Sequence, residues 1–137
     1  MKIVVALILA CLLPLSVNAA TKGIDCTQTN SQGKVLYVHA TISDSSDEAE
    51  VQTYMARAPC AQDKSCSTGV YKKEVLPTVM RLTQLQVGDI ASSYIIDINR
   101  SNLSVVTRST IRLFDKVTDD TFTGTCTVNV DESKNIL

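Results

Sequence analysis

Histidine is nearly absent from this sequence, because His39 is the only one in 137 residues. A hydrolytic triad would have to be built on that single ring. The sequence also lacks a Gly-x-Ser-x-Gly elbow, a glycine-rich phosphate loop and a His-Glu pair at helical spacing. Those motifs supply nucleophiles, phosphate cradles and metal ligands. Their absence predicts a protein without a catalytic residue, a cofactor or a metal ion.

Clustered basic charge is missing as well. The chain has 13 lysines and arginines against 14 aspartates and glutamates, and its net charge is −1. A nucleic-acid interface needs a concentrated basic face, so we expect no nucleic-acid partner and no strong attraction to anionic membranes. No internal repeat or low-complexity linker divides the chain, which predicts a single domain.

The acidic residues raise two alternatives, a calcium-binding loop and a small enzyme with a carboxylate acid and base. Acidic residues cluster between positions 44 and 50, but they lack the alternate spacing and central glycine of a calcium-binding EF-hand loop, which favours a solvated turn. Asp89 and Asp97 are the candidates for the acid and base of a small carboxylate enzyme. A cavity containing both side chains would support that alternative.

The longest apolar run stands at the amino terminus. Lys2 precedes an apolar stretch over residues 3–15, and small residues precede a cleavage site after Ala19. The stretch is shorter than the roughly 20 residues that a bilayer span requires. The sequence therefore predicts a signal peptide over 1–19 and no membrane span. The exported domain, 20–137, has 118 residues and a net charge of −2 once Lys2 is removed.

The expected location is a bacterial periplasm or the extracellular space, because a short signal peptide with one lysine is typical of bacterial exported proteins. Lipidation at Cys11 is the competing interpretation, since residues 8–11 loosely resemble a lipobox. The apolar run continues through Leu15 instead of stopping at the cysteine. This continuation favours cleavage after Ala19.

Four cysteines remain once Cys11 is removed, and an oxidising compartment favours two disulfides. Cys60 and Cys66 are separated by only five residues, so we expect them to pair. That pairing leaves Cys26 to bridge to Cys126, near the other end of the domain. A zinc ribbon needs two close cysteine pairs, whereas this sequence has one, with too wide a spacing.

Much of the domain alternates apolar and polar residues with the period of two that strands show. In residues 34–42 one face is apolar and the other carries His39, which places the imidazole on the outer, solvated side. Residues 121–130 place threonines on one face and Cys126 on the other, so Cys126 is expected to point inward. Gly124 on that inner face predicts a bulge or a close backbone approach. Further strands are expected over 70–76, 78–86, 93–99 and 103–113.

This pattern predicts an all-β domain with two disulfides, either a small antiparallel β-sandwich or a barrel, whose ends the Cys26 to Cys126 bridge would join. One short helix is also expected over 47–57, because capping residues precede apolar residues at helical spacing from Val51 to Ala58. The alternation of Val51, Thr53 and Met55 also fits a strand, so the sequence leaves both a helix and a strand open for this segment.

Two turns are predicted in the second half of the chain. Residues 99–102 contain two Asn-x-Ser sequons, at Asn99 and Asn102, which would be glycosylated only in a eukaryotic secretory pathway. In a bacterial protein the two asparagines are interpreted as turn formers. Residues 116–120 are expected to form the last turn.

The early cysteine, the β-rich middle and the late Gly-Thr-Cys segment ending at Cys126 resemble the periplasmic inhibitors of c-type lysozyme, which are small barrels with a cysteine near each end. Those inhibitors carry a Ser-Gly-x-x-Tyr loop that enters the lysozyme cleft. Here residues 67–71 read Ser-Thr-Gly-Val-Tyr, with a different spacing. The resemblance therefore implies inhibition as an alternative function without identifying a site.

The expected function is that of a small exported, non-catalytic binding or envelope accessory protein, whose partner is an unknown protein or small ligand. An inhibitor of a host or competitor enzyme is the alternative. Binding residues are expected on a loop clipped by the Cys60 to Cys66 bridge, because such a loop has already lost conformational entropy. The candidate residues of this loop are Asp63, Lys64, Ser67, Thr68, Gly69 and Tyr71.

Overall fold

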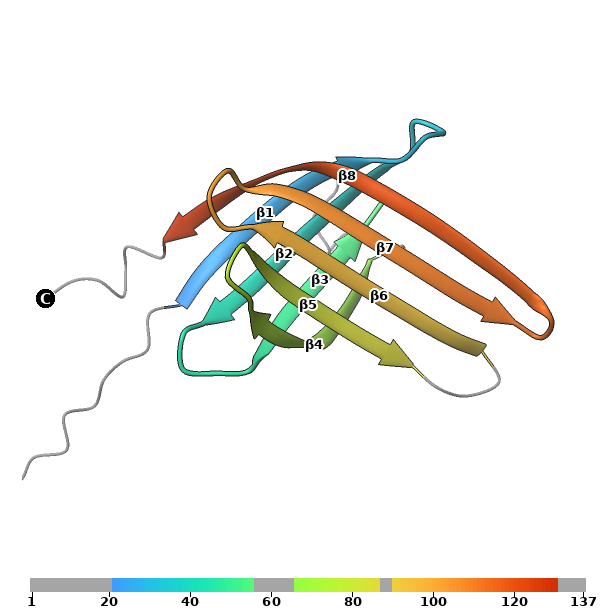
Figure 1. Ribbon diagram of the computed structural model, residues 1–137, viewed down its shortest axis with the longest axis horizontal. Coiled ribbons are helices and arrows are strands. Elements are labelled where there is room, and N and C mark those ends of the chain that lie inside the picture. Colours follow the sequence, from blue (N-terminus) through green and yellow to red (C-terminus); the bar gives the residue numbers. More distant parts are fainter. Residues whose placement is uncertain (1–20, 56–65, 87–89, 131–137) are drawn as a thin grey trace, which may run out of the picture.

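The computed structural model describes residues 21–55, 66–86 and 90–130, and every regular element in them is a β-strand. Each strand pairs antiparallel with the next, and the last pairs with the first, so the sheet closes into an eight-stranded barrel (Figure 1). The predicted all-β class is confirmed, and the architecture is the barrel. The strands are β1 Thr21–Thr29, β2 Val35–Ser43, β3 Glu48–Tyr54, β4 Ser67–Val75, β5 Val79–Gln86, β6 Ile90–Asn99, β7 Ser104–Leu113 and β8 Lys116–Val130.

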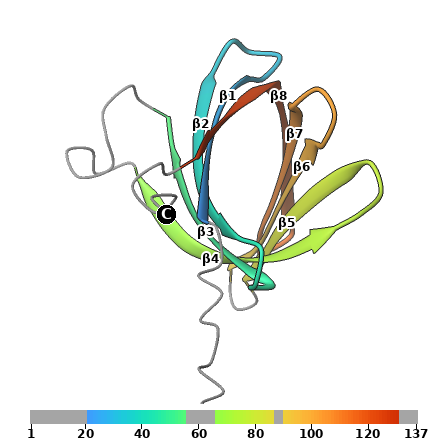
Figure 2. The same ribbon diagram turned by 90° about the vertical axis from the view of Figure 1, so that its left-hand side faces the viewer.

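The hydrophobic core lies inside the barrel, and the strands form a ring around it (Figure 2). Every second side chain of a strand points inward. On β2 the inward residues are all buried, as the alternation predicted: Leu36, Val38, Ala40 and Ile42. On β8 the threonines from Thr121 to Thr127 are exposed, whereas Phe122 and Cys126 are buried.

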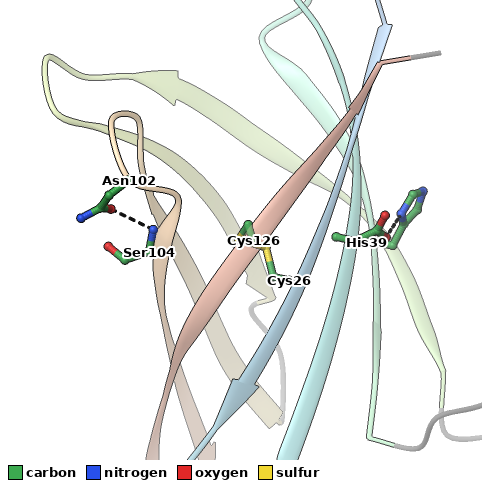
Figure 3. Close-up of a disulfide and its surroundings, with 6 residues drawn as sticks. Cys26, His39, Asn102, Ser104 and Cys126 are labelled. Atoms are coloured by element: carbon green, nitrogen blue, oxygen red, sulfur yellow. Dashed lines mark hydrogen bonds and ion pairs between the residues drawn. A yellow bond between two sulfur atoms is a disulfide. The ribbon is translucent and has the colours of Figure 1, made fainter. Parts of the chain in front are cut away.

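A disulfide joins the two strands that close the barrel. Cys26 on β1 and Cys126 on β8 lie directly opposite each other, with a Cα–Cα distance of 4.0 Å, and both are buried (Figure 3). The predicted long bridge is therefore confirmed. Cys66 is also disulfide-bonded, but Cys60 lies outside the described residues, so the predicted short bridge stays a prediction.

The backbones of β1 and β8 approach each other closely at Gly124. A Cβ atom at this position would overlap the carbonyl oxygen of Thr27 and lie 2.8 Å from the Cα of Gln28. The close backbone approach predicted for Gly124 is thus present. Because no side chain fits there, glycine is required for the contact between the first and last strands.

The helix predicted over 47–57 is wrong for its described part, because residues 48–54 form β3. Ala49 and Val51 are buried inside the barrel, while Glu48 and Glu50 are exposed. This arrangement has a period of two, and β2 and β4 supply hydrogen-bonding partners on both sides of the segment. Tertiary pairing therefore overrides the local capping signal.

The turn predicted over 116–120 is also wrong, because those residues belong to β8. Lys116 already pairs with Leu113, which leaves Phe114 and Asp115 as the turn. Phe114 adopts a positive φ of 55°, the conformation that a two-residue hairpin turn requires. The polar residues after the turn are thereby free to continue the strand.

The turn predicted at 99–102 is confirmed, and its asparagines stabilise it. The Asn99 side-chain oxygen accepts hydrogen bonds from the backbone N–H groups of Ser101 and Asn102, at 2.9 and 3.2 Å. The Asn102 side chain accepts one from Ser104, at 2.9 Å (Figure 3). Such local bonds fix a turn without help from the core.

Several predictions fall on residues outside the described ranges: the signal peptide over 1–19, Cys11, and the side chains of Asp63, Lys64 and Asp89. Within residues 21–55, 66–86 and 90–130, no helix is long and apolar enough to span a membrane.

Candidate functional site

The barrel contains a cavity of about 330 Å³ at the end that carries the β7–β8 turn, on the right in Figure 1. Its base and walls are apolar or aromatic, formed by Leu36, Tyr54, Tyr71, Tyr94, Ile96 and Phe122. Its lining also carries hydroxyl groups and one carboxylate, those of Thr53, Ser67, Thr107, Ser109, Thr118 and Asp120. This mixture of apolar surface and a few polar groups is typical of small-molecule sites.

The cavity lies where inward side chains are small and polar. Along β7 the inward positions change from Val105 to Thr107 and Ser109 before Ile111, and along β3 they change from Val51 to Thr53. An eight-stranded barrel is just wide enough for large side chains to fill. Small inward side chains, such as those of Thr107 and Ser109, leave part of this interior unfilled.

The opposite end of the barrel is filled. Leu103, in the β6–β7 turn, packs against the core, and its carbonyl accepts a hydrogen bond from the Cys126 N–H at 2.8 Å. Lys73 is buried there, and its ammonium donates to the Ser43 carbonyl at 2.5 Å. Among the described residues, Leu103 and Lys73 thus occupy the end of the barrel opposite the cavity.

Two buried polar side chains inside the barrel have no hydrogen-bond partner among the described residues. Gln28 on β1 is 1% exposed, with both atoms of its amide unpartnered, and Thr107 on β7 is 2% exposed, with its hydroxyl unpartnered. Thr107 lines the cavity, and Gln28 pairs with Leu36, which also lines it. Burying such groups without a partner costs roughly 1–3 kcal/mol each, so these positions favour an occupant that forms hydrogen bonds.

Asp120 is the one charged side chain among the described residues that line the cavity. Its two carboxylate oxygens accept hydrogen bonds from the Asn30 amide, at 3.2 and 3.1 Å. The Asn30 side-chain oxygen in turn accepts from the N–H groups of Gln32 and Lys34, at 3.0 and 2.9 Å. The β1–β2 turn therefore holds the carboxylate in place.

Tyr71 stands in the wall of the cavity and is 4% exposed. Its burial, and secondarily the neighbouring charge of Tyr94, raise the pKa of Tyr71 to about 12. The hydroxyl is therefore neutral at physiological pH and can donate a hydrogen bond to an occupant.

The raised pKa predicts a loss of stability in alkali. Because the unfolded tyrosine ionises near pH 10 and the folded one near 12, the unfolded state binds fewer protons between these values and stability falls as the pH rises. Between pH 9 and pH 11 we expect Tyr71 to lower the free energy of unfolding by about 1.3 kcal/mol. Urea unfolding of the wild type and of Tyr71→Phe at both pH values measures this. An equal loss in both proteins would contradict it.

Exposed apolar side chains lie at the end of the barrel that carries the cavity. Phe114, in the β7–β8 turn, is 81% exposed, and Met55, which lines the cavity, is 44% exposed. Exposed apolar side chains beside an opening are a feature of binding sites.

His39 lies on the outer wall of the barrel, as predicted, and it has partners that the sequence did not reveal. Its Nδ1 lies 2.5 Å from the Asp25 carboxylate (Figure 3), and the second oxygen of Asp25 accepts a hydrogen bond from the Asn129 amide at 2.5 Å. Asp25 pairs with His39 across β1 and β2, so the contact was detectable only once β1 was known to be a strand. None of the three lines the cavity.

Asp97, proposed as one half of a carboxylate pair, also faces outward. Arg81 binds it with two hydrogen bonds, Nε to Oδ1 at 2.7 Å and Nη2 to Oδ2 at 2.9 Å. The side chain is therefore engaged in an ion pair on the outer wall and does not line the cavity. Among the described residues, including the acidic ones between 44 and 50, no group of three or more His, Cys, Asp or Glu side chains is placed to hold a metal ion.

The candidate binding residues from 67 to 71 lie in a strand and not in a loop. Ser67 and Tyr71 point inward and line the cavity, whereas Thr68 is exposed on the outside. Gly69 lies between them on the inner side, where an added Cβ atom would overlap the Gln84 side chain. Two of the predicted binding residues, Ser67 and Tyr71, thus line the cavity, although the sequence predicted them on a surface loop.

Comparison of the chain with known protein families, curated proteins and solved structures finds no match.

Proposed function

We propose that this protein is a non-catalytic binding protein that holds one small, largely apolar molecule in the barrel cavity. The observation that carries the proposal is an apolar cavity with a buried, unpartnered hydroxyl in its lining, that of Thr107. The unpartnered amide of Gln28 belongs to the residue that pairs with Leu36, which also lines the cavity. A bound molecule would contribute the hydrogen bonds that these groups lack and would cover the apolar lining.

The volume limits the size of the bound molecule. A water molecule occupies roughly 30 Å³ of liquid, so 330 Å³ corresponds to about eleven non-hydrogen atoms. This lies at the small end of the range for small-molecule sites. The proposal is therefore a ligand of fragment size, too small to be a lipid with two chains.

Export is part of the proposal. The Cys26 to Cys126 disulfide supports it, because such bonds persist in oxidising compartments. The apolar run over residues 3–15 supports it from the sequence. A binding protein of this kind would meet its ligand in the periplasm or outside the cell.

Binding of 1-octanol tests the proposal, because the alcohol has nine non-hydrogen atoms, an apolar chain and one uncharged hydroxyl. We expect a Kd below about 1 mM, with NMR shifts confined to residues that line the cavity. In Ser109→Leu the added side chain occupies the cavity, and we expect binding to weaken at least roughly tenfold, about 1.4 kcal/mol.

Thr121→Leu is the matched control, because it adds the same side chain to an exposed position on β8. It should leave octanol binding unchanged. If both variants bind octanol like the wild type, or if the shifts map to the outer wall, the cavity is not the binding site and the proposal fails.

A further inference from the structure

We infer that the ligand carries a cationic amine, which Asp120 binds at the mouth of the cavity. The inference rests on the proposed function, since it names the chemical class of the molecule that the cavity holds. The lining of the cavity carries an acidic group, Asp120, and no lysine, arginine or histidine stands among its described residues.

The buried lysine of the barrel cannot compensate for this charge. Lys73 lies at the filled end, where its ammonium donates to the Ser43 carbonyl. The β1–β2 turn that holds Asp120 through Asn30 lies at the other end of β2. The negative charge at the mouth therefore has a neutral partner, the Asn30 amide, and no cationic one among the described residues.

The carboxylate is also held ready for a second partner. Both of its oxygens accept from a single nitrogen of Asn30, and each carboxylate oxygen can accept more than one hydrogen bond. Ser109 pairs with Asp120 across β7 and β8, and Thr118 lies two residues along the same face. An ammonium group has three donors, which this carboxylate and these hydroxyls can accept.

The aromatic lining favours the same class of ligand. Tyr71 and Tyr94 line the cavity together with Phe122. Tyr54 also borders it, but its ring stacks on that of Tyr37 at a centroid distance of 5.2 Å. Aromatic ring faces attract a cation, and aromatic surfaces bury an apolar body. A carboxylate or phosphate ligand would instead bring a second negative charge beside Asp120, where the partly enclosed site strengthens the repulsion.

The site therefore fits a primary amine on an apolar body of about nine to twelve non-hydrogen atoms, the size set by the cavity. Three probes with the same chain and different head groups test this at pH 7: octylamine, 1-octanol and octanoate. We expect octylamine to bind roughly tenfold more tightly than octanol, because hydrogen bonds to charged groups are stronger than neutral ones. Octanoate should bind more weakly than octanol.

Asp120→Asn should remove the preference, so that octylamine and octanol bind this variant with similar affinities. Asp119→Asn is the matched control, since it removes the same charge from the neighbouring exposed position on β8, and it should keep the preference. The salt dependence of the wild type is a second readout that needs no variant: added salt should weaken octylamine binding more than octanol binding.

The outcomes separate the inference from the proposed function. If octanol binds in the cavity but octylamine binds no better, or if Asp119→Asn and Asp120→Asn act alike, the amine inference is overturned and the binding function stands. If none of the three probes binds in a manner that Ser109→Leu weakens, both are overturned.

Discussion

Replacing Cys26 and Cys126 together by alanine should lower the free energy of unfolding by about 4 to 5 kcal/mol. The bridge closes a loop whose ends are 100 residues apart in sequence, and the chain-entropy model assigns about 4.7 kcal/mol to a loop of that length. The two cysteines also face each other across β1 and β8, the seam that closes the barrel. Without the bridge, that seam depends on backbone hydrogen bonds and packing alone.

Urea unfolding of the oxidised wild type and of the double variant measures this loss, with equal slopes expected if only stability changes. Cys60→Ala with Cys66→Ala is the comparison. If those two cysteines pair as the sequence predicts, they close a loop of only seven residues, for which the same model gives about 2.3 kcal/mol. A larger loss from the second pair would show that the seam bridge is not the principal covalent constraint.

The closing strand was the part of the fold most accessible from the sequence. Its threonines are compatible with water and with strand geometry, so their alternation with Phe122 and Cys126 indicated both the strand and its inner face. From that inner face came the correct expectation that Cys126 is buried and bridges to Cys26. An alternation with a period of two thus predicts a strand and its inner face where one face of the segment is uniformly apolar.

Strand β1 was not foreseen. Its inward positions include Ile24 and Cys26 but then Gln28, so the apolar side of the alternation is broken. Gly23 and Asp25, both poor strand formers, weaken it further. What makes these residues a strand is pairing with β2 and β8 on both sides, and such pairing becomes visible only when the barrel is closed.

The cavity was missed for a related reason. A cavity inside a barrel is lined by inward residues that do not resemble a core, here Thr107, Ser109 and Asp120. Read along the sequence, Asp120 was placed in a turn, because polar residues between two strands usually form one. Only the position of the two-residue turn at Phe114 and Asp115 brings Asp120 onto the inner face of β8.

The cavity and the seam, the contact between β1 and β8 that closes the barrel, depend on each other. Gln28 and Phe122 belong to the two strands of the seam, β1 and β8. A barrel that opened there would expose the cavity to water and lose its enclosed apolar lining. Substitutions that separate β1 from β8 should therefore reduce ligand binding as well as stability.

Gly124→Ala is the sharpest such substitution, and we expect it to lower the free energy of unfolding by about 3 kcal/mol. The added Cβ atom would overlap the Thr27 carbonyl oxygen and press against the Gln28 backbone. Backbone atoms cannot rotate away as a flexible side chain can, so β8 must shift from β1 or the register must change. The shift would also move Gln28, so binding of 1-octanol should weaken in the same variant.

Gly23→Ala is the matched control, because it makes the same change on β1 of the same seam. There the nearest atom to an added Cβ is Cε1 of His39 at 3.5 Å, an ordinary contact. Replacing glycine by alanine within a strand at such a site should be neutral or slightly stabilising, since it restricts the unfolded chain. Urea unfolding of both variants measures the two changes in the free energy of unfolding, and octanol binding is the second readout. If the two substitutions lower the free energy of unfolding equally, the loss reflects a general need for glycine in these strands. The close approach of β8 to β1 at Thr27 would then not be the reason for the glycine at position 124.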